Sequence, residues 1–169
     1  MPTSSANSLV AEPAVVNASP LVVLAKAELL DLLKLEGEPV FVPDAVEREV
    51  RHHSPDAASR SLDSQRWLRV VASPPIPHLI EAWDLGDGES SVLAWALAHP
   101  GCVAILDDLA ARRCASALGI ACRGCLGLVL LAKNRGILPK ARPIVRKLRD
   151  AGLYLSDSVV DRALALVGE

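Results

Sequence analysis

Five oxygen-bearing side chains lie just beyond predicted strands or near the starts of the helices that follow them: Asn17, Glu49, Glu89, Asp107 and Asp108. Asn17 directly follows the apolar segment 14–16, and Asp107 and Asp108 directly follow the apolar segment 102–106. Ligands of open parallel α/β sheets bind beyond the carboxyl ends of the strands. We therefore expect these side chains to converge, although they are distant in sequence.

Carboxylates that converge repel one another, and they tolerate crowding mainly when a cation lies between them. Oxygen ligands without a nearby His or Cys suit Mg²⁺ or Mn²⁺ rather than Zn²⁺. Such ions can activate a water molecule and hold a phosphodiester for in-line attack. Taken singly, Glu89 is equally explained as a favourable charge at a helix start, and Asp107 or Asp108 as a helix cap. Only the placement of the whole set favours a site.

The elements that must position these residues alternate along the chain. Apolar segments typical of short strands occupy residues 14–16, 39–42, 67–71, 102–106 and 120–122. Helical patterns occupy residues 20–37, a stretch that opens at Pro43, residues 90–98, 109–118, 126–134 and 143–151, and a last stretch from Ser156 to Leu166. This alternation predicts a central parallel sheet of about four or five strands between helices, which is a three-layer α/β/α fold.

Local signals give the expected boundaries. Ser19 is a favourable N-cap and Pro20 a favourable first residue for the first helix. Residues 51–65 are polar and are expected to form a loop or a weak helix. Residues 1–13 are rich in Ser, Ala, Asn and Pro and are predicted to form a disordered arm. One domain with a C-terminal helical extension is then expected over residues 14–169.

Composition narrows the class of protein. Hydrophobic residues make up 51% of the chain but aromatic residues only 3%. A core of Val, Leu, Ala and Ile suits parallel strands that are buried on both faces, and the lack of aromatic rings argues against a protein that binds single strands by base stacking. The net charge is −2, so contact with nucleic acid would need a local basic patch or a bound cation.

The chain shows neither a membrane-spanning apolar run nor a basic start followed by an apolar stretch. We expect a cytoplasmic protein that does not enter membranes and whose four cysteines are reduced thiols. Cys122 and Cys125 have the spacing of a redox or zinc motif, but they lack a second ligand pair and are interpreted as small core residues. His52 and His53 are interpreted as solvated.

Several segments resemble known proteins. VVNASPLVVLAKAELLDLL resembles the opening of PIN-domain proteins, and FVPDAVEREV resembles their second strand and helix. GDGESSVLAWALAH and CVAILDDLAARRCASALGI resemble the third and fourth motifs of that superfamily. RGCLGLVLLAKNRGILPKARPIVRKLRDAGLYLSDSVV resembles the C-terminal part of a prokaryotic branch with a GxLGxxLLAKxxG segment. The resemblance extends over about residues 14–166, and it rests on the order and spacing of the motifs.

The resemblance implies a PIN-like α/β/α fold and an Mg²⁺- or Mn²⁺-dependent ribonuclease that acts on RNA. Many such proteins are VapC-type toxins, which a small antitoxin protein holds inactive. The acidic positions of the superfamily, with the hydroxyl beside the first of them, fall on Asn17 with Ser19, on Glu49, on Glu89, and on Asp107 or Asp108. The resemblance thus implies a metal held by Asn17, Glu89 and one or both of the two aspartates, with Glu49 completing the catalytic set.

Asn17 departs from this pattern, because an aspartate is usual there. An amide oxygen can coordinate a metal but brings no charge, so the affinity for a divalent cation should fall. An amide is also no useful general base. Two hypotheses therefore stand. The first is a metal-dependent endoribonuclease, which the resemblance implies is the toxin of a toxin–antitoxin pair, and the second is a non-catalytic PIN-like module that binds RNA or protein.

Cationic side chains provide candidate phosphate contacts. Ser19, Arg112 and Arg113 are expected near a substrate phosphate, although the two arginines fit a solvated helix face equally well. A basic run follows near the C-terminus, and its helical spacing favours a solvated face over an RNA groove: Lys140, Arg142, Arg146, Lys147 and Arg149. The apolar helices at both ends of the domain are compatible with a homodimer.

Overall fold

The sheet of this protein is parallel throughout and has five strands in the part of the chain that the computed structural model describes, residues 13–53 and 57–169. The strands are β1 (Ala14–Val16), β2 (Val40–Pro43), β3 (Leu68–Val71), β4 (Val103–Ile105) and β5 (Cys122–Arg123), in the spatial order β3-β2-β1-β4-β5. The predicted parallel sheet is therefore confirmed. The predicted arm at residues 1–13 lies outside the described residues, apart from Pro13.

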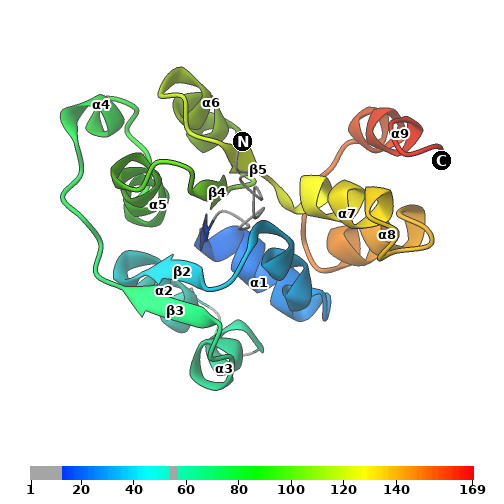
Figure 1. The fold of residues 1–169 in the computed structure, drawn as a ribbon, viewed down its shortest axis with the longest axis horizontal. Helices are drawn as coiled ribbons and strands as arrows, with labels where there is room; N and C mark the ends of the chain where they lie inside the picture. Colours follow the sequence, from blue (N-terminus) through cyan, green and yellow to red (C-terminus); the bar gives the residue numbers. More distant parts are fainter. Residues whose placement is uncertain (1–12, 54–56) are drawn as a thin grey trace, which may run out of the picture.

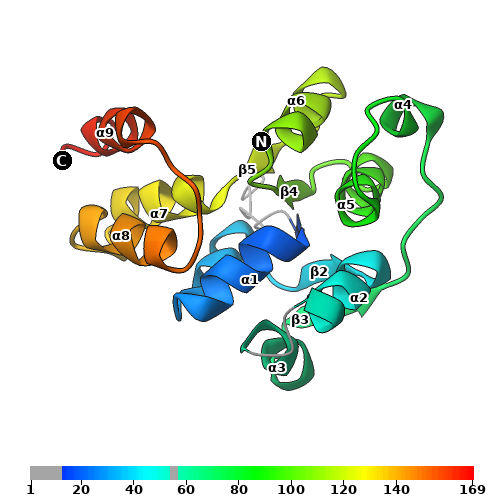
Figure 2. The ribbon, with the colours of Figure 1, turned by 180° about the vertical axis from the view of Figure 1, so that it is seen from behind.

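Helices flank the sheet in a three-layer arrangement, as predicted (Figures 1 and 2). They are α1 (Ala18–Lys26), the 3-10 helix η1 (Leu30–Glu36), α2 (Asp44–His53), α3 (Ala57–Ser64), α4 (His78–Glu81), α5 (Asp87–Ala98), α6 (Leu109–Ala117), α7 (Cys125–Asn134), α8 (Arg142–Asp150) and α9 (Asp157–Ala165). Figure 1 shows α7, α8 and α9 grouped at one end of the molecule, beyond β5. Among the described residues, no helix is both long and apolar enough to cross a membrane.

The two central strands bring the first half of the chain to the second. β1 pairs with β4 in a register that aligns Val16 with Ile105. All three residues of β1 are fully buried, as expected for an apolar strand covered on both faces. The strands run in the same direction, so their carboxyl ends lie at one edge of the sheet. Asn17 and Leu106, the residues that follow, are therefore neighbours at this edge.

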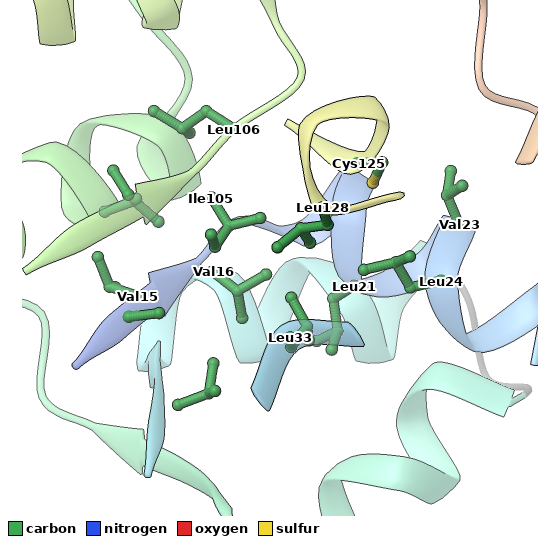
Figure 3. Close-up of a cluster of buried hydrophobic side chains, with 14 of the residues drawn as sticks. Val15, Val16, Leu21, Val23, Leu24, Leu33, Ile105, Leu106, Cys125 and Leu128 are labelled. Carbon is green, nitrogen blue, oxygen red and sulfur yellow. The ribbon is translucent and has the colours of Figure 1, made fainter. Parts of the chain in front are cut away.

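The core around these strands is aliphatic, as the composition indicates. Figure 3 shows Val15, Val16 and Ile105 of the central strands packed with Leu21 of α1 and Leu128 of α7, and all five side chains are fully buried. The helical group beyond β5 thus shares one core with the start of the chain. A rigid core of this kind fixes where the sheet edge presents its polar residues.

The first predicted helix was wrong in both its start and its extent. In the structure α1 begins at Ala18, and its N-cap is Asn17 rather than Ser19. α1 ends at Lys26, and η1 follows instead of a continuous helix to residue 37. The cause is Glu28, whose φ of 58° places the backbone in the left-handed region. No Gly or Pro marks this break, so helical spacing alone extended the prediction across it.

Other boundaries moved by a few residues. α5 begins at Asp87 rather than at residue 90, because Gly86 is its N-cap. The last strand is Cys122–Arg123 rather than residues 120–122. The polar segment 51–65 contains the end of α2 and all of α3, so the helix is confirmed over the loop where the structure describes this segment. These shifts leave the predicted order of strands and helices intact.

Candidate functional site

Asn17 is buried at the carboxyl end of β1 with one polar atom unsatisfied. Its side chain is 5% exposed, and its backbone N–H donates to the carbonyl oxygen of Ile105 at 3.1 Å. Although Asn17 is the N-cap of α1, its side chain makes no capping hydrogen bond. Its Oδ1 has no hydrogen-bond partner within residues 13–53 and 57–169. A buried acceptor without a donor is costly, and this oxygen is therefore available to a ligand.

Glu49 and Gly88 lie beside this unsatisfied oxygen. A Cβ atom built on Gly88 would lie 2.5 Å from Glu49 Oε2 and 3.1 Å from Asn17 Oδ1. Both oxygens are thus within 3.1 Å of a single point, although Asn17 precedes α1, Glu49 lies in α2 and the glycine lies in α5. The absence of a side chain at Gly88 leaves room for them. The sequence prediction missed this role, and the only signal for it was a glycine directly before Glu89.

Asn17, Glu49, Glu89 and Asp108 form a set that we call the acidic group, and Glu89 is its electrostatic centre. Burial raises the pKa of its carboxyl above the ordinary value, and the negative charges of Asp108 and Glu49 raise it further. The backbone N–H of Gly86 donates to Glu89 Oε2 at 3.3 Å and acts in the opposite direction. The two carboxylates that influence Glu89 come from α2 and from the residue before α6. Three predicted acidic residues therefore do share one field.

Asp107 and Asp108 point to different partners. Asp108 is the N-cap of α6 and accepts a hydrogen bond from the N–H of Ala111 at 2.9 Å. Asp107 Oδ1 instead accepts from the N–H of Cys125, the first residue of α7, at 2.8 Å. The other carboxyl oxygen of Asp107 is buried and has no partner among the described residues. Asp108 is the one of the pair whose charge raises the pKa of Glu89.

The predicted phosphate contacts are only partly near the acidic group. Ser19 is exposed on α1 and lines a hollow of about 340 Å³ together with Glu49. Arg112 is exposed on α6, and its Nη1 lies 2.8 Å from the position that a Cβ of Gly124 would occupy. Asp107 Oδ1 lies at the same distance from that position. Arg112 is therefore a neighbour of Asp107 rather than of Glu89. Arg113 is exposed on the same helix.

A polar contact fixes the helix that carries Glu49. The Ser73 hydroxyl and the Ser73 N–H donate to Asp44 Oδ1, the latter at 3.1 Å. The N–H of Ala45 donates to the Ser73 hydroxyl oxygen at 3.2 Å. These bonds hold the start of α2 to the segment that follows β3. They lower the pKa of the Asp44 carboxyl, with the Ser73 hydroxyl as the largest cause and Arg48 as a further one.

The donor chemistry of the acidic group can be tested against a divalent cation. The unsatisfied amide oxygen of Asn17, the adjacent Glu49 carboxylate and the crowded Glu89 carboxylate are hard acceptors, which suit such an ion. Within the described ranges, no group of three His, Cys, Asp or Glu side chains is close enough to hold a metal. The set thus suits Mg²⁺ or Mn²⁺ by the type of its donor atoms alone, and water molecules would have to supply the remaining ligands, which Mg²⁺ usually keeps.

The four cysteines are thiols that lie outside the acidic group. All four are free. Cys125 is fully buried at the start of α7, and burial together with the charge of Asp107 raises the pKa of its thiol. Cys122 is half-buried, and burial likewise raises the pKa of its thiol. Raised thiol pKa values disfavour the reactive thiolate.

Comparison with known proteins identifies a family for this chain. A family model described as a PIN domain matches residues 13–169. No curated protein and no solved structure matched the chain. The PIN fold is of the nuclease type, and PIN domains generally use divalent metal ions. Since the match extends over nearly the whole chain, the protein belongs to this PIN domain family.

Proposed function

We propose that this protein is a metal-dependent endoribonuclease and the toxin component of a toxin–antitoxin pair. The observation that carries the proposal is the unsatisfied Asn17 Oδ1 beside Glu49 Oε2 at Gly88. Glu89 supports it, because its carboxyl is affected by both Glu49 and Asp108. Perturbed carboxylates at the carboxyl edge of a parallel sheet are typical of functional sites.

In this proposal, Glu89 and Asp108 would hold Mg²⁺ or Mn²⁺, and Asn17 would contribute its amide oxygen. The bound ion would lower the pKa of a water molecule and neutralise charge on the phosphodiester. Glu49 is exposed at the adjacent hollow, where its carboxylate accepts hydrogen bonds from water and orients it. Ser19 lines the same hollow and donates to a substrate phosphate.

Asp107 has a positioning role in this scheme. Its Oδ1 holds the N-terminus of α7 through Cys125, and Arg112 lies beside it. Asp108 is preferred as the ligand because its charge acts on Glu89. Arg112 and Arg113 remain candidates for phosphate contact on the exposed side of α6.

The direct test is cleavage of a single-stranded RNA with Mg²⁺ or Mn²⁺, with EDTA as the metal-free control. Glu89→Gln preserves the shape of the side chain and removes its charge, so it should abolish cleavage. Calorimetry with Mn²⁺ should show weaker binding in the same variant. Cleavage that persists in EDTA or in Glu89→Gln would reject the mechanism.

The toxin assignment needs a separate experiment in cells. Expression of the wild-type chain should arrest growth, and Glu89→Gln should not. Co-expression of a small protein encoded directly upstream should relieve the arrest. Growth that is equally affected by both chains would argue against a toxin that acts through RNA cleavage.

A second candidate is a non-catalytic PIN-like module that binds RNA or protein. Asn17 favours it, because an amide supplies no charge at the position that the cation would need. Asn17→Asp discriminates between the two. A large gain in cleavage and in Mn²⁺ affinity would indicate a weakened nuclease. Unchanged inactivity, with Mn²⁺ binding restored, would favour the binding module.

A further inference from the structure

Positive charge is concentrated at the C-terminal end of this acidic chain. Residues 1–132 contain 10 Lys and Arg against 16 Asp and Glu, whereas residues 133–169 contain 8 against 4. The first part therefore has a formal charge of −6 and the second of +4, which together give the net −2. The second part forms the end of α7 and the helices α8 and α9, which lie together in Figure 1. Such a separation creates a local field that net charge conceals.

Much of this charge surrounds one hollow. The hollow has a volume of about 540 Å³ and lies between the end of α7, the start of α8 and the last two residues. Its charged lining residues are Lys133, Lys140, Arg142, Arg146 and Glu169. We call it the basic hollow. Four cationic side chains against one acidic side chain leave it with an excess of three positive side-chain charges, in contrast to a solvated helix face where opposite charges alternate.

An anion already occupies part of the basic hollow. The Glu169 carboxylate accepts hydrogen bonds from the N–H of Ala141 at 2.6 Å and from the N–H of Arg142 at 3.1 Å. Lys133 Nζ lies 3.5 Å from the same carboxylate. These contacts lower the pKa of the Glu169 carboxyl. The start of α8 is therefore built to receive negatively charged oxygens, as helix N-termini are.

Two cations of the basic hollow remain available. In the described ranges, Lys140 and Arg146 form no ion pair, and both are exposed. Arg142 is less available, since its Nη2 donates to the Glu169 backbone oxygen at 3.1 Å. An arginine recognises phosphate with two parallel N–H groups and a lysine acts as a point charge. Lys140 and Arg146 thus provide both kinds of phosphate contact.

Helix α8 connects the basic hollow with the acidic group. Ala151 and Gly152, directly after α8, line the 340 Å³ hollow that also contains Ser19 and Glu49. Figure 2 shows α8 beside α1, and Lys26 and Lys147 of these two helices line a further hollow together with Glu28 and Asp150. A helix of nine residues is about 13 Å long. The basic hollow is thus only a short distance from the acidic edge, by which we mean the carboxyl edge of the sheet with the acidic group and Asp107.

We propose that the basic hollow binds phosphates of the RNA strand that is cleaved at the acidic group, with Lys140 and Arg146 as the contacting residues. This inference rests on the proposed nuclease function. The acidic edge repels a polyanion, so a separate cationic surface is needed to retain RNA on a chain of net charge −2. The scarcity of aromatic residues, 3% of the chain, also leaves backbone charge as the main source of affinity.

The test compares two double variants in a Glu89→Gln background, where RNA stays intact. Lys140→Gln/Arg146→Gln neutralises the basic hollow. Arg60→Gln/Arg66→Gln changes the net charge equally at two exposed arginines before β3. Fluorescence anisotropy with a labelled single-stranded RNA is recorded across KCl concentrations. We expect the first pair to weaken binding about tenfold and to reduce the salt slope by about 1.4, since each phosphate contact contributes roughly 0.7 on a single strand. The control pair should retain the wild-type slope.

Each other result has a definite meaning. Equal losses in both double variants would show that only net charge matters, and unchanged binding in Lys140→Gln/Arg146→Gln would show that RNA binds elsewhere; both overturn the inference. It is also overturned if the chain binds poly-glutamate but no RNA through these residues, which would make the hollow a site for an acidic protein.

The inference and the proposed function can fail separately. With Glu89 intact, metal-dependent cleavage of a dinucleotide, too short to reach the basic hollow, should be unaffected by Lys140→Gln/Arg146→Gln. If RNA binding depends on the hollow but no substrate is cleaved, the nuclease proposal fails and RNA binding at the hollow stands. If cleavage is metal-dependent but RNA affinity does not change when the hollow is neutralised, the nuclease proposal stands and RNA binding at the hollow fails.

Discussion

The acidic edge and the basic hollow differ in how their polar groups are buried and paired. At the acidic edge, oxygens of Asn17 and Asp107 are buried next to the central strands and lack partners in the described part of the chain. At the basic hollow, the charged groups lie at or near the ends of α7, α8 and the chain, and the Glu169 carboxylate pairs with Lys133 and accepts a hydrogen bond from the N–H of Ala141. The energy of a buried, unsatisfied oxygen changes strongly when a single neighbouring atom is added or removed. Exposed cations instead attract an anion jointly, and salt screens this attraction. Substitutions should therefore have large local effects at the edge and small, salt-dependent effects at the hollow.

The largest effect is expected when Asp107 and Asp108 are substituted one at a time. Asp108→Asn keeps an oxygen to cap α6 but removes the charge beside Glu89, so RNA cleavage should fall by at least about 100-fold. Asp107→Ala loses the hydrogen bond to Cys125, and it should reduce the free energy of unfolding by about 1–2 kcal/mol. Cleavage assays and urea denaturation measure the two effects. If Asp107→Asn abolishes cleavage while Asp108→Asn retains it, the assignment of the ligand is reversed.

The next effect tests the space that Gly88 leaves. In Gly88→Ala the added Cβ would collide with Glu49 Oε2 and press on Asn17 Oδ1. We expect cleavage to fall about tenfold or more, while the melting temperature stays equal or rises, because alanine favours a helix over glycine by about 1 kcal/mol. Gly86→Ala is the matched control, since its Cβ would meet Glu89 Oε2 at an ordinary 3.7 Å. Equal activity in the two variants would show that the two oxygens tolerate displacement.

A smaller effect concerns the contact that fixes α2. The pKa of Asp44 is lowered in the folded chain, so its contribution to stability is present above the unfolded pKa, about 3.9. That contribution is lost as the pH falls through the lower folded pKa. The melting-temperature difference between wild type and Asp44→Asn should therefore be constant near neutral pH and shrink below about pH 4. In a Ser73→Ala background, Asp44→Asn should have little further effect. A difference that grows in acid would contradict this account.

The smallest effect is expected at the basic hollow. Glu169→Gln removes the internal negative charge, so RNA affinity should increase about two- to threefold at low salt and the gain should vanish at high salt. The pKa of Glu169 is also lowered in the folded chain, so its stabilising contribution is present above the unfolded pKa and is lost in acid. Anisotropy titrations at two salt concentrations measure the change in affinity. Weaker RNA binding in Glu169→Gln would indicate that the carboxylate is needed to shape the hollow.

Much of the fold could be predicted because its signals are local. The apolar segments that became β1 and β4, and the Ser156 cap of α9, are visible in the sequence. The break after α1 was not, because Glu28 adopts a left-handed backbone without a glycine. The expected convergence of acidic side chains also follows from a local signal, since strand ends of a parallel sheet share an edge, and Glu49 and Asp108 do lie near enough to Glu89 to affect its pKa. The proximity of Gly88 to two oxygens depends on the packing of three helices, and no local pattern reports it.

The sequence by itself determined the alternation of strands and helices, the aliphatic core and the concentration of cations after residue 132. These features follow from residue type and short-range periodicity, which the chain carries at every position. Only the tertiary structure decided that Asn17 keeps a free oxygen, that Asp108 rather than Asp107 acts on Glu89, and that α8 joins the acidic edge to the basic hollow. The physical reason is that strand order and helix packing, rather than spacing in the sequence, set the distances over which charges and hydrogen bonds act.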